Sequence, residues 1–277
     1  MEDLAGEKEM TVLIKYPKET EKRNKIFFEK KDQELTNLDW AKWSGWFDTD
    51  GSFSSQIYTY KKQKSAPHLR QVNSLKLNDK QPVELFSKTF ETSLSCNTWK
   101  TTTPKPYKKE YMATVYQAAL LADKAIWFTK NVYPFLIKEE KKDYAAKLLG
   151  YKPESKDFAD WTPEEVRNYL ATAIEGDGGI VIRVGKKAIS IRAHVTSSEV
   201  QYLSDLRNIT EKKLGTLFNL SKVGRYKTKK GIKTKYVIYI DGSQITQKNL
   251  DFFQSLLEEG VMTLDRKKQK VQEFVNQ

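Results

Sequence analysis

Cysteine is almost absent from this chain, and so are long apolar runs. The single cysteine among 277 residues, Cys96, cannot form an internal disulfide. No apolar stretch is long enough to span a membrane, and the N-terminal residues do not resemble a signal peptide. We therefore expect an intracellular protein in a reducing compartment, with no membrane partner, although cytoplasm, nucleus and organelle are not distinguished.

Histidine is scarce as well, since the chain has only His68 and His194. Structural and catalytic zinc sites are built largely from cysteine and histidine. This content therefore argues against zinc chemistry and against HNH-type sites.

Acidic residues are outnumbered by basic ones. The chain carries 48 Lys and Arg against 36 Asp and Glu, for a formal net charge of +12. Such a charge suits a protein that binds a polyanion, but lysine-rich chains are often simply soluble, so charge alone gives about even odds of nucleic-acid binding. Hydrophobic residues at 39% and aromatic residues at 12% indicate an ordered globular fold of one large or two modest domains.

One kind of segment occurs twice. WSGWFDTDGSF (Trp43–Phe53) and LATAIEGDGGI (Leu170–Ile180) each run from apolar and small residues into an acidic residue followed by glycine. The apolar spacing before the first copy predicts a helix over 37–50, with Thr36 or Asn37 as N-cap. A Thr162–Glu165 capping box and a proline at the first helical position predict a second helix over 163–177.

The elements that follow each predicted helix come in the same order. In the first half we expect strands near 53–61 and 69–78, a helix at 82–90, strands near 96–102 and 111–117, and helices at 118–131 and 138–149. In the second half we expect strands at 180–186 and 189–196, a helix at 199–214, strands around 217–226 and 236–240, and helices at 244–259 and 264–274. Both halves are therefore αββαββα units of an α+β protein, and the duplication predicts a pseudo-twofold molecule.

The same pattern divides the chain. Residues 1–35 form an N-terminal extension of undefined role, with a short strand at 11–16 and a charged helix at 18–32. The first unit covers 36–149, the polar stretch 150–160 is the linker, and the second unit covers 161–277.

The repeated acidic residues have a physical consequence. Asp50 and Asp177 would end the two helices, with Gly51 and Gly178 in a left-handed turn that stops each one. A carboxylate at a helix C-terminus faces the negative end of the helix dipole and needs a cation. Gly45 and Thr49 on one helix, and Thr172 and Gly176 on the other, are small enough to let the helices approach. The two aspartates would then form an oxygen-only site suited to Mg²⁺ or Mn²⁺.

The two segments resemble the LAGLIDADG motifs of homing endonucleases. Aligned with the nine-letter pattern, they are WSGWFDTDG (Trp43–Gly51) and LATAIEGDG (Leu170–Gly178), and both keep the eighth-position acid and the final glycine. The resemblance covers residues 37–277 and is to the single-chain, two-motif branch of the family. It implies a saddle of two antiparallel sheets with the two motif helices at its centre, acting as a monomer on double-stranded DNA at a long asymmetric site.

The resemblance also implies which residues act. Metal would be held by Asp50 and Asp177, with the backbones of Thr49 and Gly176, and Lys141 and Lys267 would complete the catalytic groups, with Lys142 and Lys268 as close rivals. DNA would face residues that alternate with the core in the first two strands of each half. These are Gln56, Tyr58, Tyr60, Lys62, Arg70, Ser74, Lys76, Asn78, Arg183, Lys187, Ser190, Arg192, His194 and Thr196.

Three functions follow from the resemblance. The first is a site-specific endonuclease that hydrolyses one phosphodiester in each DNA strand with a divalent metal. The second is a maturase that binds intron RNA, and the third is a non-cleaving DNA-binding regulator. Two retained aspartates argue against the regulator, because a purely binding protein gains nothing from uncompensated carboxylates beside phosphate. Asp48 and Glu175 at the sixth motif position are expected to be structural, and Trp40, Trp43 and Trp46 are expected in the core.

Overall fold

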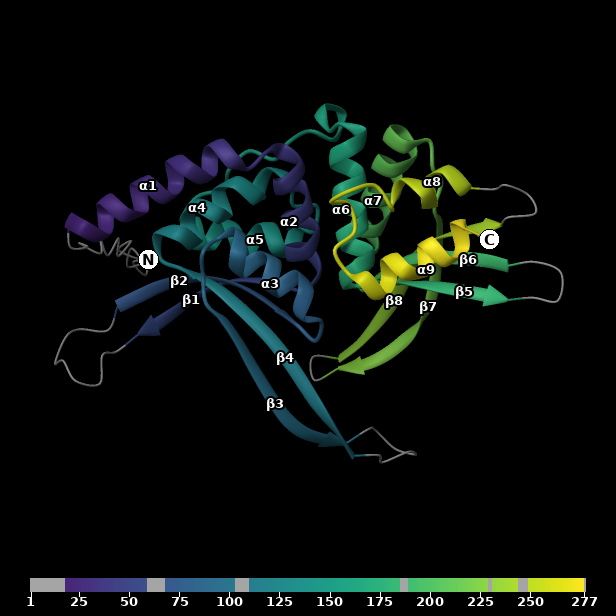
Figure 1. The fold of residues 1–277 in the computed structure, drawn as a ribbon, viewed down its shortest axis with the longest axis horizontal. Coiled ribbons are helices and arrows are strands. Elements are labelled where there is room, and N and C mark those ends of the chain that lie inside the picture. The colour runs from purple at the N-terminus through teal and green to yellow at the C-terminus, as the bar shows by residue number, and fades with distance from the viewer. Residues whose placement is uncertain are drawn as a thin grey trace, which may run out of the picture.

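The computed structural model describes residues 18–58, 68–102, 110–184, 189–228, 231–243 and 249–276. A first helix, α1 (Lys18–Glu34), precedes two halves with the same order of elements (Figure 1). The strand predicted at 11–16 lies outside these ranges. None of the helices within them is long and apolar enough to cross a membrane.

Both halves begin with a long central helix. The first half contains α2 (Asn37–Thr49), β1 (Gly51–Tyr58), β2 (His68–Leu77), α3 (Lys80–Thr89), β3 (Leu94–Thr102), β4 (Glu110–Leu121), α4 (Asp123–Val132), the 3₁₀ turn η1 (Tyr133–Phe135) and α5 (Glu139–Leu149). The second contains, after η2 (Phe158–Asp160), α6 (Pro163–Gly176), β5 (Gly178–Val184), β6 (Ile189–Ser197), α7 (Val200–Leu214), β7 (Asn219–Thr228), β8 (Gly231–Ser243), α8 (Leu250–Ser255) and α9 (Asp265–Val275). Each described half is thus an αββαββα unit followed by one further helix.

The two sheets have the same topology. Each is antiparallel and four-stranded, in the order β1-β2-β4-β3 in the first half and β5-β6-β8-β7 in the second. Figure 1 shows α2 and α6 side by side at the centre, with one sheet on either side of them. The α+β, two-half architecture expected from the duplication is confirmed.

Both central helices begin where the sequence predicts. Thr36 is the N-cap of α2, and its partner in a capping box is Asp39. Thr162 and Glu165 form the capping box of α6, with Pro163 at the first position. These bonds satisfy amide groups that the first helical turn leaves free.

The helix predicted at 118–131 is wrong at its start. Residues 118–121 belong to β4, and α4 begins only at Asp123. Alanine and leucine favour helices, but here Ala118 and Leu120 are buried alternately and their strand pairs with β2. Pairing with a neighbouring strand has overridden local propensity.

The helix predicted at 244–259 is also too long. Within the described part of that range, 249–259, only Leu250–Ser255 is helical, and 244–248 lie outside the described residues. Asn249 has a φ of 57°, a left-handed conformation that prevents α8 from starting earlier.

An aromatic cluster fills the core of the first half. Trp40, Trp43 and Trp46 are all buried, as expected, and Trp43 packs edge-on against Phe86 with ring centroids 5.3 Å apart. Helix α1 joins this core through Phe28, whose ring stacks on Trp127 at 5.5 Å. Helix α1 therefore braces the helical layer of the first half.

Candidate active site

The central helices meet at two small residues. A β-carbon on Gly45 would collide with the Thr172 hydroxyl and with the backbone carbonyl of Tyr169, and one on Gly176 would collide with Thr49. Thr172 Oγ1 also donates to the carbonyl oxygen of Lys42 across the interface, at 3.0 Å. The close approach expected from these residues is confirmed.

The glycine that ends each motif acts differently from the prediction. Gly51 and Gly178 do not adopt a left-handed turn, because each is the first residue of a strand and neither has a positive φ. Both are needed for space. A β-carbon on Gly51 would overlap the Phe47 ring, and one on Gly178 would overlap the carbonyl of His194.

Asp50 and Asp177 follow directly on the last residues of α2 and α6. The pKa of Asp50 is raised to about 6, first by burial and then by the negative charge of Asp177, while nearby lysines oppose the shift. Among the described residues, none donates a hydrogen bond to the Asp50 carboxylate. A cation between the two carboxylates would relieve this unfavourable charge.

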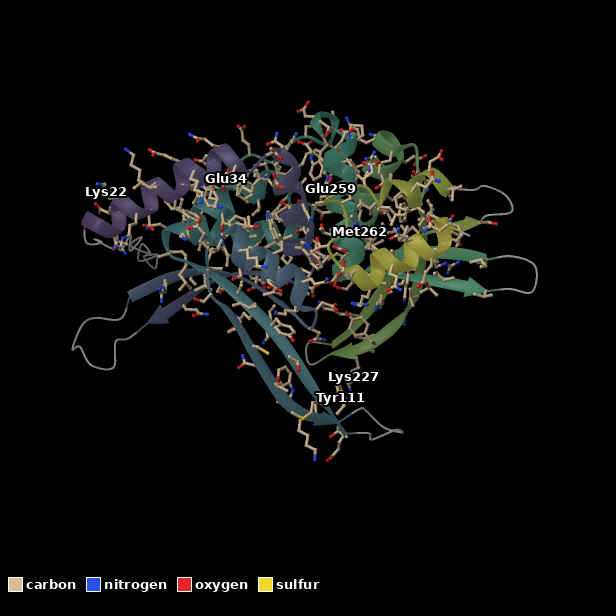
Figure 2. The ribbon with its side chains drawn as sticks, viewed as in Figure 1. Lys22, Glu34, Tyr111, Lys227, Glu259 and Met262 are labelled. Carbon is tan, nitrogen blue, oxygen red and sulfur yellow. The ribbon has the colours of Figure 1, made fainter. Side chains whose placement is uncertain are left out.

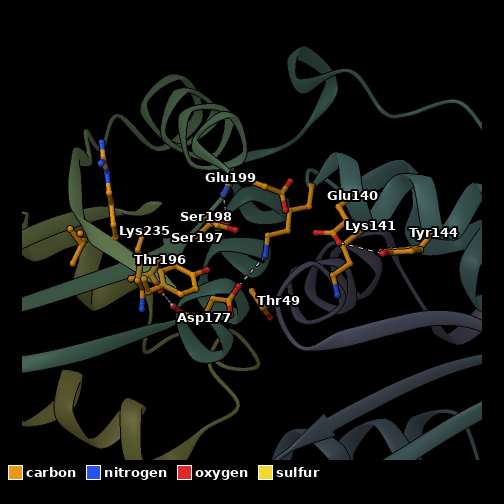
Figure 3. Close-up of a pocket in the computed structure, with 15 residues that line it drawn as sticks. Thr49, Glu140, Lys141, Tyr144, Asp177, Thr196, Ser197, Ser198, Glu199 and Lys235 are labelled. Atoms are coloured by element: carbon orange, nitrogen blue, oxygen red, sulfur yellow. Dashed lines mark hydrogen bonds and ion pairs between the residues drawn. The ribbon is translucent and has the colours of Figure 1, made fainter. Parts of the chain in front are cut away.

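Open clefts lie beside both aspartates. The cleft next to Asp177 has a volume of about 780 Å³ and is lined on one side by α5 of the first half and on the other by β6, β7 and β8 (Figure 3). A second cleft of about 360 Å³ contains Asp50, with Lys76 and Arg266 in its wall. Each carboxylate can thus be reached from outside.

The donor set at this point fits Mg²⁺ or Mn²⁺. In the described part of the chain, no three carboxylate, histidine or cysteine side chains are grouped closely enough to hold a metal ion by themselves. Two carboxylates remain, with the nearby backbone carbonyls of Thr49 and Gly176. Mg²⁺ keeps several waters and binds through one or two carboxylates together with substrate phosphates, so such a set is adequate for it and unsuited to zinc.

The two predicted lysines both bind the turn that follows a motif helix. Lys141 Nζ donates to the Gly51 carbonyl and lines the cleft beside Asp177. Lys267 Nζ donates to the carbonyls of Ile174 (2.8 Å), Glu175 (2.6 Å) and Gly178 (3.1 Å). Burial lowers the pKa of both amines, that of Lys267 to about 8. The Lys267 ammonium stabilises the negative end of α6, and the Lys141 ammonium binds the first residue of β1.

The rival lysines do not contact the motif segments among the described residues. Lys142 Nζ forms an ion pair with Glu139 at 3.2 Å, on its own helix. No contact of the Lys268 amine with the motif segments is among the interactions of the described residues. Of the two pairs of lysines, Lys141 and Lys267 are therefore the pair that contacts the motif segments.

Lys138 lies at this site although the sequence pattern did not single it out. Its Nζ donates to Asp177 Oδ2 at 3.0 Å and to the carbonyl of Asp48 at 2.8 Å. The residue precedes α5 in the first half, whereas Asp177 belongs to the second. No local pattern could indicate a contact that depends on how the two halves pack.

The sixth-position acids hold the last helix of each half. Asp48 accepts hydrogen bonds from the backbone amides of Ile137 (2.7 Å) and Lys138 (3.3 Å) at the start of α5. Glu175 accepts bonds from the amides of Thr263 and Leu264, both at 2.6 Å, at the start of α9. Burial raises the pKa of Asp48 to about 6 and that of Glu175 to about 7. Their structural role is as expected.

Most of the predicted DNA-facing residues lie on the sheet face away from the core. In the first half Gln56, Lys76 and Asn78 are exposed, whereas Arg70 and Ser74 are partly buried. In the second half Arg183 is exposed and Ser190, Arg192, His194 and Thr196 alternate with buried neighbours on β6. Tyr58 is placed in β1 by its backbone alone, and Tyr60, Lys62 and Lys187 lie outside the described residues.

Several of these side chains already have partners. Arg192 forms a bidentate ion pair with Asp241, at 2.6 and 2.8 Å, and lies over the Tyr239 ring. Thr196 Oγ1 donates to the backbone carbonyl of Asp177 at 2.8 Å, and Ser74 shares a hydrogen bond with Ser52. Arg192 is therefore preorganised, with much of its charge compensated.

No protein-family model and no curated protein matches the sequence. Solved structures do match. Meganuclease I-SmaMI bound to uncleaveable DNA is similar with a TM-score of 0.50 and 14% identity, over 87% of this chain and 90% of that chain. I-SmaMI, described as a LAGLIDADG homing endonuclease bound to cleaved DNA, is similar in a second structure with a TM-score of 0.47 and 12% identity, over 87% and 88%. The first similarity establishes the fold, which is the fold expected from the paired motifs.

Proposed function

We propose that this chain, which has the fold of single-chain LAGLIDADG homing endonucleases, is a site-specific DNA endonuclease. It would bind a long asymmetric duplex site as a monomer and hydrolyse one phosphodiester in each strand with Mg²⁺ or Mn²⁺. The I-SmaMI structures, one with uncleaveable and one with cleaved DNA, support a nuclease on this scaffold.

One observation carries the proposal. The Gly45–Thr172 and Gly176–Thr49 contacts bring two helices together that each end in an aspartate, and the two sheets flank that point. Burial raises the pKa of Asp50 and the charge of Asp177 adds to the shift, so the pair destabilises the metal-free protein. A fold that keeps such a pair between two exposed sheets is suited to bind cations and phosphate there.

Each group would have a distinct task. Asp50 and Asp177, with the backbones of Thr49 and Gly176, would each hold divalent metal. When bound, that metal would supply an activated water and neutralise charge that develops on the phosphate. Lys141 lines the cleft beside Asp177 and would stabilise the additional negative charge of the transition state. Lys267 has its bonds directed to carbonyl groups, so it would keep the Asp177 turn in position.

The sheet faces would select the DNA sequence. Arg183, Lys76 and Gln56 are exposed on strands beside the motif helices and can reach guanine, phosphate or adenine. Arg192 presents a fixed guanidinium, a geometry that suits a specific contact more than a general one. The net charge of +12 would add sequence-independent attraction to the phosphates.

The test is cleavage of a randomised duplex library by the purified protein, in Mg²⁺ and in Ca²⁺. We expect Mg²⁺ to give a unique double-strand break. Asp50→Asn and Asp177→Asn should each bind the selected site and fail to make that break. Asp143→Asn, at an exposed position on α5, is the matched control and should cut like the native chain.

Two results would contradict the proposal. One is a library that is neither cut nor selectively bound under any metal. The other is tight binding of folded intron RNA without binding of duplex DNA, which would favour a maturase.

A further inference from the structure

The two aspartates differ in their immediate surroundings. Asp177 accepts a hydrogen bond from Lys138 Nζ at 3.0 Å, and the Lys138 side chain is only 9% exposed. In the described part of the chain, the Asp50 carboxylate receives no such bond. One carboxylate is thus bonded directly to an ammonium group, whereas the other interacts with the nearby lysines through charge alone.

The position equivalent to Lys138 in the second half holds an apolar residue. Asp48 accepts hydrogen bonds from the amides of residues 137 and 138, and Glu175 accepts the same pair of bonds from residues 263 and 264. Lys138 therefore corresponds to Leu264, which is 1% exposed. The pseudo-twofold symmetry is broken by one ammonium group.

The Lys138 ammonium is held firmly in place. It also donates to the Asp48 carbonyl at 2.8 Å, and it lies 4.9 Å from the centre of the Tyr202 ring. Its stem is buried, so it cannot move freely into solvent. A divalent cation that approaches Asp177 would meet a positive charge already bonded to one carboxylate oxygen.

We propose that Lys138 makes the two aspartates unequal toward divalent metal, so that Asp50 binds it first and Asp177 only at a higher concentration. Repulsion between charges a few ångströms apart at a partly exposed site supports a difference of about tenfold in affinity. This inference rests on the proposed function in one respect: the DNA strand served by Asp177 would be cut second, and a nicked intermediate would accumulate at low Mg²⁺.

Metal binding can be measured without any cleavage. Mn²⁺ would be titrated into the full chain in the absence of DNA, and free Mn²⁺ followed by electron paramagnetic resonance. Asp50→Asn leaves only Asp177, and Asp177→Asn leaves only Asp50. We expect the Asp50→Asn protein to bind Mn²⁺ about tenfold more weakly than the Asp177→Asn protein.

Replacement of Lys138 separates its charge from its bulk. Lys138→Met keeps the buried stem and removes the ammonium, so it should strengthen Mn²⁺ binding about tenfold in the Asp50→Asn background and strengthen it much less in the Asp177→Asn background, where Lys138 acts on Asp50 only through charge. Lys138→Arg keeps the charge, so it should bind Mn²⁺ with the same affinity as the protein with lysine at this position. Thermal unfolding of each variant establishes that it is folded. Equal affinities with Lys and Met at position 138 would overturn the proposal.

A strand-specific assay separates this inference from the proposed function. With each strand of the selected site labelled, limiting Mg²⁺ should give a nick in one strand, and Lys138→Met should make the two rates more equal. Equal rates in the native chain would overturn the inference and leave the endonuclease intact. Absence of cleavage would contradict the endonuclease, while the Mn²⁺ titration would still decide the role of Lys138.

Discussion

Gly45 lies directly against the hydroxyl group of Thr172 and the backbone carbonyl of Tyr169. A backbone atom cannot turn away as a side chain can, so a methyl group at position 45 must push α2 and α6 apart. This contact is part of what brings Asp50 near Asp177.

Gly45→Ala should therefore destabilise the protein by about 1–3 kcal/mol, the usual cost of overpacking. Cleavage activity should fall even under conditions in which the variant remains folded, because the aspartates would be displaced. The matched control is Gly224→Ala, because a β-carbon there meets nothing within 4 Å and the residue has no positive φ. Urea unfolding of both variants decides the matter, and equal midpoints would refute a tight interface.

Asp48 and Asp50 are two residues apart, but their mutation should change the stability of the protein in opposite directions. Asp48→Ala leaves the amides of Ile137 and Lys138 and the hydroxyl of Tyr169 without their acceptor, at a cost of about 2–4 kcal/mol. Asp50→Asn removes a partly buried charge whose pKa is about 6 in the folded protein, so at pH 7.5 it should stabilise the metal-free chain by about 1 kcal/mol. Thermal unfolding without metal measures both, and a loss of stability in Asp50→Asn would contradict the repulsion described here.

Asp241 should limit the charge that Arg192 offers to DNA. Asp241→Ala releases the guanidinium from its bidentate pair and removes a negative charge from the sheet face. The slope of log affinity against log salt concentration should become steeper by about 1, as for one added phosphate contact. Asp251→Ala removes the same charge on α8 and should leave the slope unchanged. Fluorescence anisotropy at several salt concentrations gives the slopes. Equal slopes for the native chain and Asp241→Ala would show that Arg192 does not contact the DNA phosphates.

His194 should make the protein less stable in mild acid. Burial lowers the pKa of its imidazole, with added effects from Lys267 and Arg192, so the unfolded chain binds the proton more readily than the folded one. Stability contributed by the neutral ring is present above a pH of about 6.5 and is lost as pH falls through that value.

Asp48 and Glu175 change stability in the opposite sense over this range, because their pKa values are raised. The effect of His194 is therefore measured as the difference in stability change between the native chain and a variant without the histidine. His194→Gln should lose less stability than the native chain between pH 7.5 and pH 5.5, by up to about 1 kcal/mol. Urea midpoints at the two pH values measure it, and parallel changes would exclude the histidine.

Much of this architecture could be predicted because its signals are local. The capping boxes at Thr36 and Thr162 and the alternation along β6 depend on neighbours in sequence. The Ala-rich start of the predicted helix at 118 failed because its strand pairing with β2 involves residues more than forty positions away. Local composition carries no information about such a partner.

The site divides in the same manner. The two aspartates and the small residues between the helices were visible as a repeated pattern. Lys138 was not, because its bond to Asp177 joins the halves and its counterpart in the repeat is Leu264. A residue that differs between the two halves, such as Lys138, cannot be found by comparing the halves for shared residues.

The helix interface has a consequence for how the halves recognise each other. Position 45 in one motif corresponds to position 172 in the other, and 49 corresponds to 176, so a glycine faces a threonine at both levels. Two copies of the first half would place glycine against glycine at one level and threonine against threonine at the next. Neither half can therefore pair with a copy of itself through the same Gly–Thr contacts at this helix interface. If the chain were divided between the halves, the fragments should assemble as a mixed pair, each preferring the other to a copy of itself.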